Sequence, residues 1–312
     1  MSAALKFQDF EARLAKMASI EEPQLKRTAA ADGIDLAYKV FQPVGDFNDM
    51  LVLYHGGGAN MRGGYAWLAA ELAGRAPLAV CLTDMRGHGL SGGRRGHTDP
   101  PAAVWRDVDC IATRVARDFP GVAIHLGGHS SAAGMLLNYR TIHQPQADVR
   151  SLVLLAPECG FRANLYRTSA GSSGSFGRAN IWPFLLNAFS AGRLGGSLPA
   201  VRLNYEDSRL ASEIGCISSY SVNMALAVTP NEPARQLARL DLPTWVGIAE
   251  DDELIDAAKL DAFLVRHSPS TLRRRVIPGA THLGVILEAV APILAAMGFD
   301  AEHMLPTTVQ KS

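Results

Sequence analysis

An apolar stretch, a sharp turn of small residues and the start of a helix follow one another directly at residues 124–134. Ser130 stands in the turn, with Gly128 two residues before it and Ala132 two residues after it. Such a turn holds the serine backbone in a strained conformation, so strand and helix can pass each other only if both flanking side chains are small. The sequence therefore predicts a strand–turn–helix unit that lifts the Ser130 hydroxyl clear of a sheet edge.

Short apolar runs alternate with helical patterns over much of the chain. Runs suited to buried parallel strands, and one more polar, edge-like run, occur at residues 50–54, 78–82, 122–126, 151–155, 244–247 and 272–277. Helical patterns at residues 102–119 and 254–265 lie between them. Two extended runs, residues 25–28 and 36–41, flank the turn Asp32-Gly33 and predict a hairpin at a sheet edge. This alternation is typical of an α/β fold with a doubly wound, mostly parallel sheet.

Residues 1–24 precede this alternation and have a different pattern. Phe7, Phe10, Leu14 and Met17 recur at helical spacing, which predicts an amphipathic helix. We expect it to pack on the body of the protein, with a membrane-surface or dimer role as the alternative.

The alternation is interrupted between residues 157 and 240, where helical fragments and aromatic side chains replace the strands. We interpret residues 157–240 as a helical cap, inserted into a core formed by residues 25–156 and 241–312. The Ser/Gly-rich stretch 168–175 is expected to be a loop, with the hinge of a moving lid as the alternative.

Composition excludes several classes of protein. The 30 acidic and 30 basic side chains give zero formal net charge, so no overall field favours nucleic acid. The four cysteines are scattered without a C-x-x-C pair, which favours free thiols over a zinc site or a disulfide framework. Residues 1–23 carry charges throughout and lack the apolar core of a signal peptide, and no stretch is long enough to span a membrane. We therefore expect a cytoplasmic protein whose oligomeric state the sequence leaves open.

A serine hydroxyl becomes a nucleophile at neutral pH only when a base takes its proton and a third group orients that base. His282 follows the last predicted strand, where a doubly wound sheet presents side chains to the crevice at its carboxyl edge. The loop after residues 244–247 holds five acidic residues, of which Asp252 is our choice for the third group and Asp251 the alternative. The chain order serine, acid, histidine fits this combination.

Acyl transfer also needs donors aimed at the oxyanion of the tetrahedral intermediate. His55-Gly56-Gly57-Gly58 follows the first buried strand, and its glycines let backbone N–H groups approach a ligand. We predict that the N–H groups of Gly57 and Ser131 form this oxyanion hole. The alternatives for the glycine loop are an ordinary turn and a phosphate-binding loop, but the latter lacks the Lys-Ser/Thr ending of a Walker sequence.

A second glycine motif, residues 87–92, matches the dinucleotide fingerprint G-x-G-x-x-G, and Asp107 lies at a suitable distance for a ribose contact. No helix opens at these glycines, so we instead expect Asp84 and Arg86 to hold a long loop in shape. The histidines show no metal-ligand spacing. Neither a metal nor another cofactor is predicted.

Several of these motifs together resemble one known family. They are His55-Gly56-Gly57-Gly58, the 84–91 loop, Trp105-Arg106-Asp107-Val108, Phe119-Pro120-Gly121, Gly128-His129-Ser130, residues 252–256 and Gly279-Ala280-Thr281-His282. This set resembles the monoacylglycerol lipase and lysophospholipase branch of the α/β-hydrolases, a branch that is similar to serine aminopeptidases. The resemblance covers residues 32–293 except the cap. The elbow differs from the family pattern, with Ser131-Ala132-Ala133 in place of a larger residue and two glycines.

The resemblance implies hydrolysis of a carboxylic ester through an acyl-enzyme, without a cofactor. Carried over by position, it makes Ser130 the nucleophile, Asp252 the acid and His282 the base, with Gly57 and Ser131 as the oxyanion hole. The expected partner is a small acyl ester of the monoacylglycerol or lysophospholipid type. A peptidase, thioesterase or acyltransferase with the same residues, and a non-catalytic binding protein on the same fold, are the alternatives.

Overall fold

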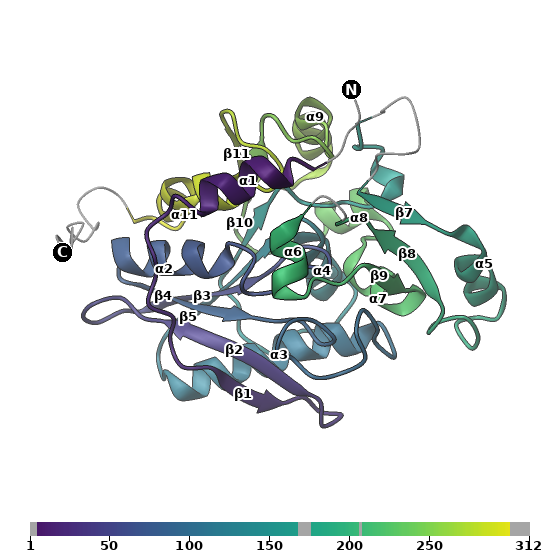
Figure 1. Ribbon diagram of the computed structural model, residues 1–312, viewed down its shortest axis with the longest axis horizontal. Coiled ribbons are helices and arrows are strands. Elements are labelled where there is room, and N and C mark those ends of the chain that lie inside the picture. The colour runs from purple at the N-terminus through teal and green to yellow at the C-terminus, as the bar shows by residue number, and fades with distance from the viewer. Residues whose placement is uncertain (1–4, 168–175, 206–207, 300–312) are drawn as a thin grey trace.

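A mostly parallel sheet of eight strands forms the centre of the fold within residues 5–167, 176–205 and 208–299, which the computed structural model describes (Figure 1). The strands are β1 (Lys26–Ala29), β2 (Asp35–Phe41), β3 (Asp49–Tyr54), β4 (Leu78–Thr83), β5 (Ala123–His129), β6 (Ser151–Leu155), β10 (Thr244–Ala249) and β11 (Leu272–Ile277). Their order in the sheet is β1-β2-β4-β3-β5-β6-β10-β11. Only the β1–β2 and β2–β4 pairs are antiparallel. The doubly wound, mostly parallel sheet predicted from the sequence is confirmed.

Strand burial follows from position in the sheet. Every residue of β4 and β10 is buried, because helices cover both faces of the central strands and leave no solvent-facing side. β11 lies at the edge of the sheet, and its central residues Arg273, Arg274 and Arg275 are exposed. The sequence run that suggested an edge strand therefore occupies an edge.

Helices pack on the two faces of the sheet and enclose two separate apolar cores. One core includes α2 (Tyr65–Arg75), α10 (Val285–Glu288) and α11 (Val290–Ala296). The other includes α3 (Ala102–Asp118), α4 (Ser131–Thr141) and α9 (Ala257–His267). The last of these begins three residues after the predicted start at residue 254, because the Asp256 side chain caps it by accepting the N–H of Lys259 at 3.0 Å.

The strand order reverses at β3. From this strand the chain moves to β4 on one side, then returns to β5 on the other side and continues outward through β6, β10 and β11. In open α/β sheets, ligands bind in the crevice outside the carboxyl ends of the strands at such a switch point. The loop 55–58 follows β3 and Ser130 follows β5, so both lie at this point.

The helix expected in residues 1–24 is shorter than predicted. Helix α1 covers Phe7–Leu14 and buries Phe7 and Phe10. Phe7 packs against the ring of Tyr205, with 5.4 Å between ring centroids, and Arg13 forms an ion pair with Glu288 at 2.6 Å. The helix thus packs on the body of the protein.

The 157–240 segment contains helices, as expected, and also an antiparallel sheet of three strands in its described part, which the sequence analysis did not predict. Its elements are η1 (Phe161–Ala163), β7 (Gly177–Ala179), α5 (Ile181–Phe189), β8 (Pro199–Leu203), α6 (Arg209–Ile214), β9 (Ser219–Ser221), α7 (Val222–Val228) and α8 (Pro233–Ala238). Strands of three to five residues are too short to show a clear alternation of apolar and polar side chains. The Ser/Gly-rich stretch 168–175 lies outside the described residues.

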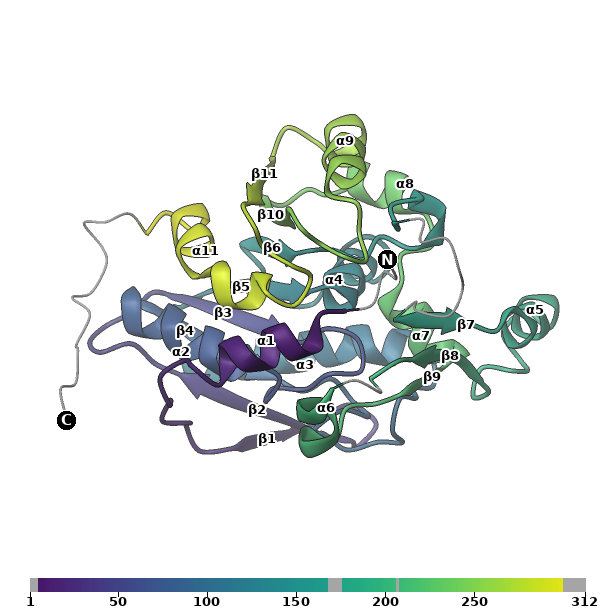
Figure 2. The same ribbon diagram turned by 45° about the horizontal axis from the view of Figure 1, so that its top comes forward.

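This segment contacts the loops at the carboxyl ends of β3 and β4. Ile217 N–H donates to the Gly58 carbonyl at 2.7 Å, and Ser221 N–H donates to the Gly96 carbonyl at 3.0 Å. Figure 2 shows α5 at the outer end of the three-stranded sheet, away from α2. Among the described helices, none combines the length and apolar character that a membrane span requires.

Candidate active site

Ser130 occupies the strained turn between β5 and α4. Its backbone has φ 54° and ψ −115°, in the region that non-glycine residues rarely adopt. The close crossing of strand and helix explains the small neighbours, since a Cβ on Gly128 would lie 2.7 Å from the carbonyl carbon of Ala132. The Ser130 N–H donates to the Leu155 carbonyl at 2.9 Å, which ties the turn to β6.

His282 and Asp252 meet Ser130 from loops that follow two other strands. The imidazole Nε2 lies 2.9 Å from Ser130 Oγ, and Nδ1 lies 2.7 Å from Asp252 Oδ2. His282 is only 3% exposed and Asp252 only 2%. If Nδ1–H donates to the carboxylate, Nε2 carries the free lone pair that accepts the serine proton.

The structure brings Asp252, not Asp251, to the imidazole. Oδ1 of Asp252 accepts the N–H groups of Leu254 and Ile255, each at 2.8 Å, which holds the carboxylate in place. Asp251 is exposed, and its side chain has no hydrogen bond or ion pair with the described residues.

The surroundings of His282 raise its pKa above the ordinary histidine value. Burial lowers the pKa, but the hydrogen-bonded Asp252 carboxylate, together with the nearby carboxylates of Glu253 and Glu158, outweighs burial. A carboxylate oxygen of Glu253 also accepts the His282 N–H at 2.9 Å. Neighbouring negative charge therefore stabilises the protonated form of His282.

Two tyrosine hydroxyls bind the loop after β3 on either side of Gly57. Gly56 N–H donates to Tyr65 Oη at 2.8 Å, and Gly58 N–H donates to Tyr220 Oη at 2.6 Å. The N–H groups of Gly57 and Ser131 have no hydrogen-bond partner among the described residues. The two residues are neighbours, since a Cβ on Gly57 would lie 3.3 Å from Ser131 Oγ. The pair predicted as an oxyanion hole is thus adjacent and free to bind a ligand oxygen.

A buried histidine orients each of these tyrosines. His129 Nε2 lies 2.9 Å from the His282 carbonyl, which only accepts, so this nitrogen carries the proton and Nδ1 accepts the Tyr65 O–H at 2.8 Å. By the same logic, His88 donates from Nδ1 to the Arg86 carbonyl at 2.9 Å and accepts the Tyr220 O–H at Nε2, at 2.8 Å. Burial lowers the pKa of both histidines, which keeps them neutral.

Sequence analysis missed both tyrosines. It also missed Tyr205, whose O–H donates to the Gly57 carbonyl. Two histidines, His88 and His129, could have indicated these tyrosines. Both lie close to the carboxyl ends of buried strands, and the sequence analysis considered them only as metal ligands. A neutral buried histidine needs one donor and one acceptor as partners, so each of them predicts a polar side chain nearby.

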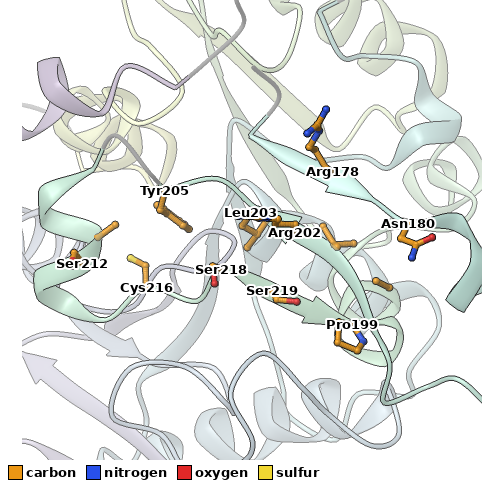
Figure 3. A pocket seen from close by; sticks show the side chains of 13 residues that line it. Arg178, Asn180, Pro199, Arg202, Leu203, Tyr205, Ser212, Cys216, Ser218 and Ser219 are labelled. Atoms are coloured by element: carbon orange, nitrogen blue, oxygen red, sulfur yellow. The ribbon is translucent and has the colours of Figure 1, made fainter. Parts of the chain in front are cut away.

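A cavity of about 310 Å³ opens beside Ser130. Its lining is mainly apolar and includes Phe161, Val201, Leu203 and Leu254, while Glu158 adds a carboxylate. Figure 3 shows a larger hollow, about 580 Å³, lined by residues of the 157–240 segment such as Arg178 and Cys216. That hollow contains neither Ser130 nor His282, so the cavity at Ser130 is the candidate substrate site.

The glycine motif at 87–92 is a structural loop, as expected. Arg86 binds Asp107 through two nitrogens at 2.5 Å, which occupies the carboxylate that a dinucleotide would need. Asp84 accepts the N–H groups of Met61 and Leu90, each at 2.7 Å. Within the described ranges, no group of three or more His, Cys, Asp or Glu side chains is arranged to hold a metal ion.

A second serine–histidine–aspartate set occurs elsewhere in the sheet. His125 Nδ1 lies 2.6 Å from Ser151 Oγ, and Nε2 lies 3.0 Å from Asp49 Oδ1. Asp49 and Ser151 are the first residues of β3 and β6, at the end of the sheet opposite Ser130. Ser151 has no strained turn and no glycine loop beside it, so the second set supplies a natural control for the first.

Comparison with known proteins shows the family of this chain. The family model Hydrolase_4, described as serine aminopeptidase, S33, matches residues 46–288. A monoacylglycerol lipase of Mycolicibacterium smegmatis is 33% identical over 111 residues, which cover 36% of this chain and 39% of that protein. The monoglyceride lipase of Homo sapiens is 26% identical over 273 residues, 85% of either chain.

Among solved structures, a soluble variant of monoglyceride lipase from Saccharomyces cerevisiae, in complex with a substrate analog, is similar to this chain with a TM-score of 0.65. The match covers 93% of this chain and 98% of that one at 16% identity, so it supports the fold alone. The family model supports membership of the family as well as the fold, because the matched residues include the glycine loop, Ser130, Asp252 and His282. The chain therefore belongs to the Hydrolase_4 family (serine aminopeptidase, S33) of the α/β-hydrolases.

Proposed function

We propose that this protein hydrolyses carboxylic esters through an acyl-enzyme on Ser130. The observation that carries the proposal is the chain of two hydrogen bonds, 2.9 Å from Ser130 Oγ to His282 and 2.7 Å from His282 to Asp252, beside two unpartnered N–H groups. Nucleophile, base and orienting acid are the parts that acyl transfer by a serine needs.

In the acylation step, Ser130 Oγ bonds to the ester carbonyl carbon while its proton passes to His282 Nε2. The carbonyl oxygen becomes an oxyanion that accepts the N–H groups of Gly57 and Ser131. When the intermediate collapses, the bond to the alcohol oxygen breaks and His282 gives its proton to the departing alcohol. Water then attacks the acyl carbon with His282 again as base, and the acid and the Ser130 hydroxyl are released.

The cavity and the relatives suggest the substrate class. Several relatives carry the name monoglyceride or monoacylglycerol lipase, and the cavity beside Ser130 is mainly apolar. An ester with an apolar acyl chain, of the monoacylglycerol or lysophospholipid type, fits these surroundings. In this proposal residues 157–240 act as a cap that encloses the acyl chain.

Labelling with a fluorophosphonate and hydrolysis of a nitrophenyl ester test the proposal. Wild type should be labelled at Ser130, and Ser130→Ala should lose label and about 10⁴-fold or more in kcat. Ser151→Ala, which removes the other histidine-bound serine, should keep both. Undiminished hydrolysis by Ser130→Ala would overturn the proposal. Assays with competing amine, thioester and alcohol substrates separate an esterase from a peptidase, a thioesterase or an acyltransferase.

A further inference from the structure

Two buried oxygen atoms of residues beside Ser130 have no hydrogen-bond partner in the described part of the chain, namely Ser131 Oγ and Glu158 Oε2. Both residues line the 310 Å³ cavity. Both are also fixed to the candidate nucleophile, since Ser131 follows it in the chain and Glu158 N–H donates to the Ser130 carbonyl at 3.1 Å. Ser131 and Glu158 therefore line the cavity next to the candidate nucleophile, and each carries one buried, unpaired oxygen atom.

The first oxygen of the Glu158 carboxylate is fully used. Oε1 accepts the Gly160 N–H at 2.7 Å and the Tyr166 O–H. Burial raises the pKa of Glu158, while these two hydrogen bonds oppose that increase by favouring the charged form. Oε2 remains an acceptor closed to bulk water, and Glu158 forms no ion pair with the described residues.

A buried acceptor without a donor is costly, and a substrate that supplies the missing donor would remove that cost. Resting on the ester hydrolysis proposed above, we infer that Glu158 is a specificity residue that accepts a hydrogen bond from a hydroxyl or ammonium group of the substrate close to the scissile ester. Apolar side chains such as Phe161, Val201 and Leu203 make up most of the remaining lining, which also includes Arg167, so the rest of the substrate is expected to be mainly apolar. The preferred ester thus carries a donor near the carbonyl and an apolar chain beyond it.

Pairs of esters that differ in one group test this inference. For a hydroxyl on the alcohol, 2-hydroxyethyl butanoate is compared with n-propyl butanoate and with 2-methoxyethyl butanoate, which offers an acceptor only. For a hydroxyl on the acid, ethyl 3-hydroxybutanoate is compared with ethyl 3-methylbutanoate. For an ammonium group, protonated 2-(dimethylamino)ethyl butanoate is compared with 3,3-dimethylbutyl butanoate. Wild type should prefer the donor in at least one pair by about tenfold or more in kcat/KM.

Glu158→Gln converts the unpaired acceptor into a donor. Gly160 N–H and Tyr166 O–H hold the amide oxygen at the Oε1 position, so the NH₂ group takes the place of Oε2. The preference for 2-hydroxyethyl over 2-methoxyethyl ester should then fall to about one or reverse, and a preference for the ammonium ester should disappear. Glu213→Gln, an exposed residue paired with Arg209, is the matched control and should keep the wild-type ratios.

Binding to Ser130→Ala, measured by calorimetry with the same ester pairs, separates this inference from the proposed hydrolysis. If no ester is hydrolysed but binding still discriminates in a Glu158-dependent way, only the proposed hydrolysis fails. If esters are hydrolysed while every pair reacts equally, or if the preference survives Glu158→Gln, the inference about Glu158 is wrong. A melting curve and fluorophosphonate labelling of Glu158→Gln show that the variant is folded when the ratios are measured.

Discussion

Tyr220, from β9 of the 157–240 segment, accepts the N–H of Gly58 at 2.6 Å and so binds the segment to the glycine loop of the core. The same hydroxyl donates to His88 at 2.8 Å. On the other side of Gly57, Tyr65 binds Gly56 in the same way from α2. With both neighbours occupied, the Gly57 N–H is left as the free donor of this loop.

If the proposed reaction takes place, Tyr220→Phe should impair it while leaving Ser130, His282 and Asp252 in place. It leaves the Gly58 N–H and His88 Nε2 unpaired in the interior, which costs about 1–3 kcal/mol, and it frees the glycine loop to move. We expect kcat to fall about tenfold or more with a smaller change in KM, because the oxyanion donor acts mainly in the transition state.

Steady-state kinetics on a nitrophenyl ester and thermal melting measure these two effects. Tyr38→Phe is the matched control, since the Tyr38 hydroxyl is buried on β2 without a hydrogen-bond partner. An unchanged kcat in Tyr220→Phe would show that the tyrosine contributes to stability alone.

Asp252→Asn should reduce kcat by about 10³–10⁴-fold. An asparagine amide can donate to His282 Nδ1, which favours the tautomer that has its proton on Nε2 and cannot accept from Ser130. Asp251→Asn is the matched control, because Asp251 is exposed and its side chain has no hydrogen bond or ion pair with the described residues. A large loss in Asp251→Asn with normal activity in Asp252→Asn would contradict the assignment.

The raised pKa of His282 predicts the pH dependence of activity. The imidazole acts as a base only when it is neutral, so kcat/KM should fall as the pH drops through this pKa. Since Asp252, Glu253 and Glu158 together outweigh burial, the midpoint of the acid limb should lie above the ordinary value of about 6.5. A midpoint well below that value would mean that burial dominates.

Glu253→Gln tests the same balance of charges. It removes one of the negative charges that raise the pKa but keeps an acceptor for the His282 N–H, so the acid midpoint should move to lower pH. Glu250→Gln is the control, because Glu250 accepts the Gly279 N–H at 2.8 Å in the same loop but is not among the main causes of the His282 pKa shift. Equal shifts in both variants would assign the effect to the loop rather than to the charge.

Gly128→Ala should disturb the Ser130 turn. The new Cβ would lie 2.7 Å from the Ala132 backbone, which forces strand and helix apart at a cost of about 1–3 kcal/mol. Fluorophosphonate labelling and thermal melting should both decline. Gly74→Ala is the contrasting control, because the exposed Gly74 on α2 has no atom within 4 Å of the new Cβ and the change should stabilise the helix by about 0.5–1 kcal/mol.

Most of the core fold was predictable because its signals are local. The buried strands β3, β4, β6 and β10 are short apolar runs between polar loops. The structure forms a strand at each run from which the sequence predicted one. The turn at Ser130 is equally local, since small residues within two positions of it decide whether strand and helix can cross. Loop position after a strand was also enough to point to His282 and to an acidic loop, because parallel strands bring their carboxyl ends to one edge. Within that loop it left Asp251 as the alternative to Asp252.

The sequence by itself thus determined the doubly wound sheet, the strained turn and the loops from which Ser130, Asp252 and His282 approach one another. Only the tertiary structure decided which groups support them: Tyr220 is 162 residues from Gly58 in the chain, and Tyr65 is 64 from His129. It also decided that short strands in residues 157–240 form a sheet and that one oxygen of Glu158 is left unpaired beside the cavity. The physical reason is that hydrogen bonds between distant side chains depend on where packed elements meet, whereas strand and turn preferences act between neighbours in the chain.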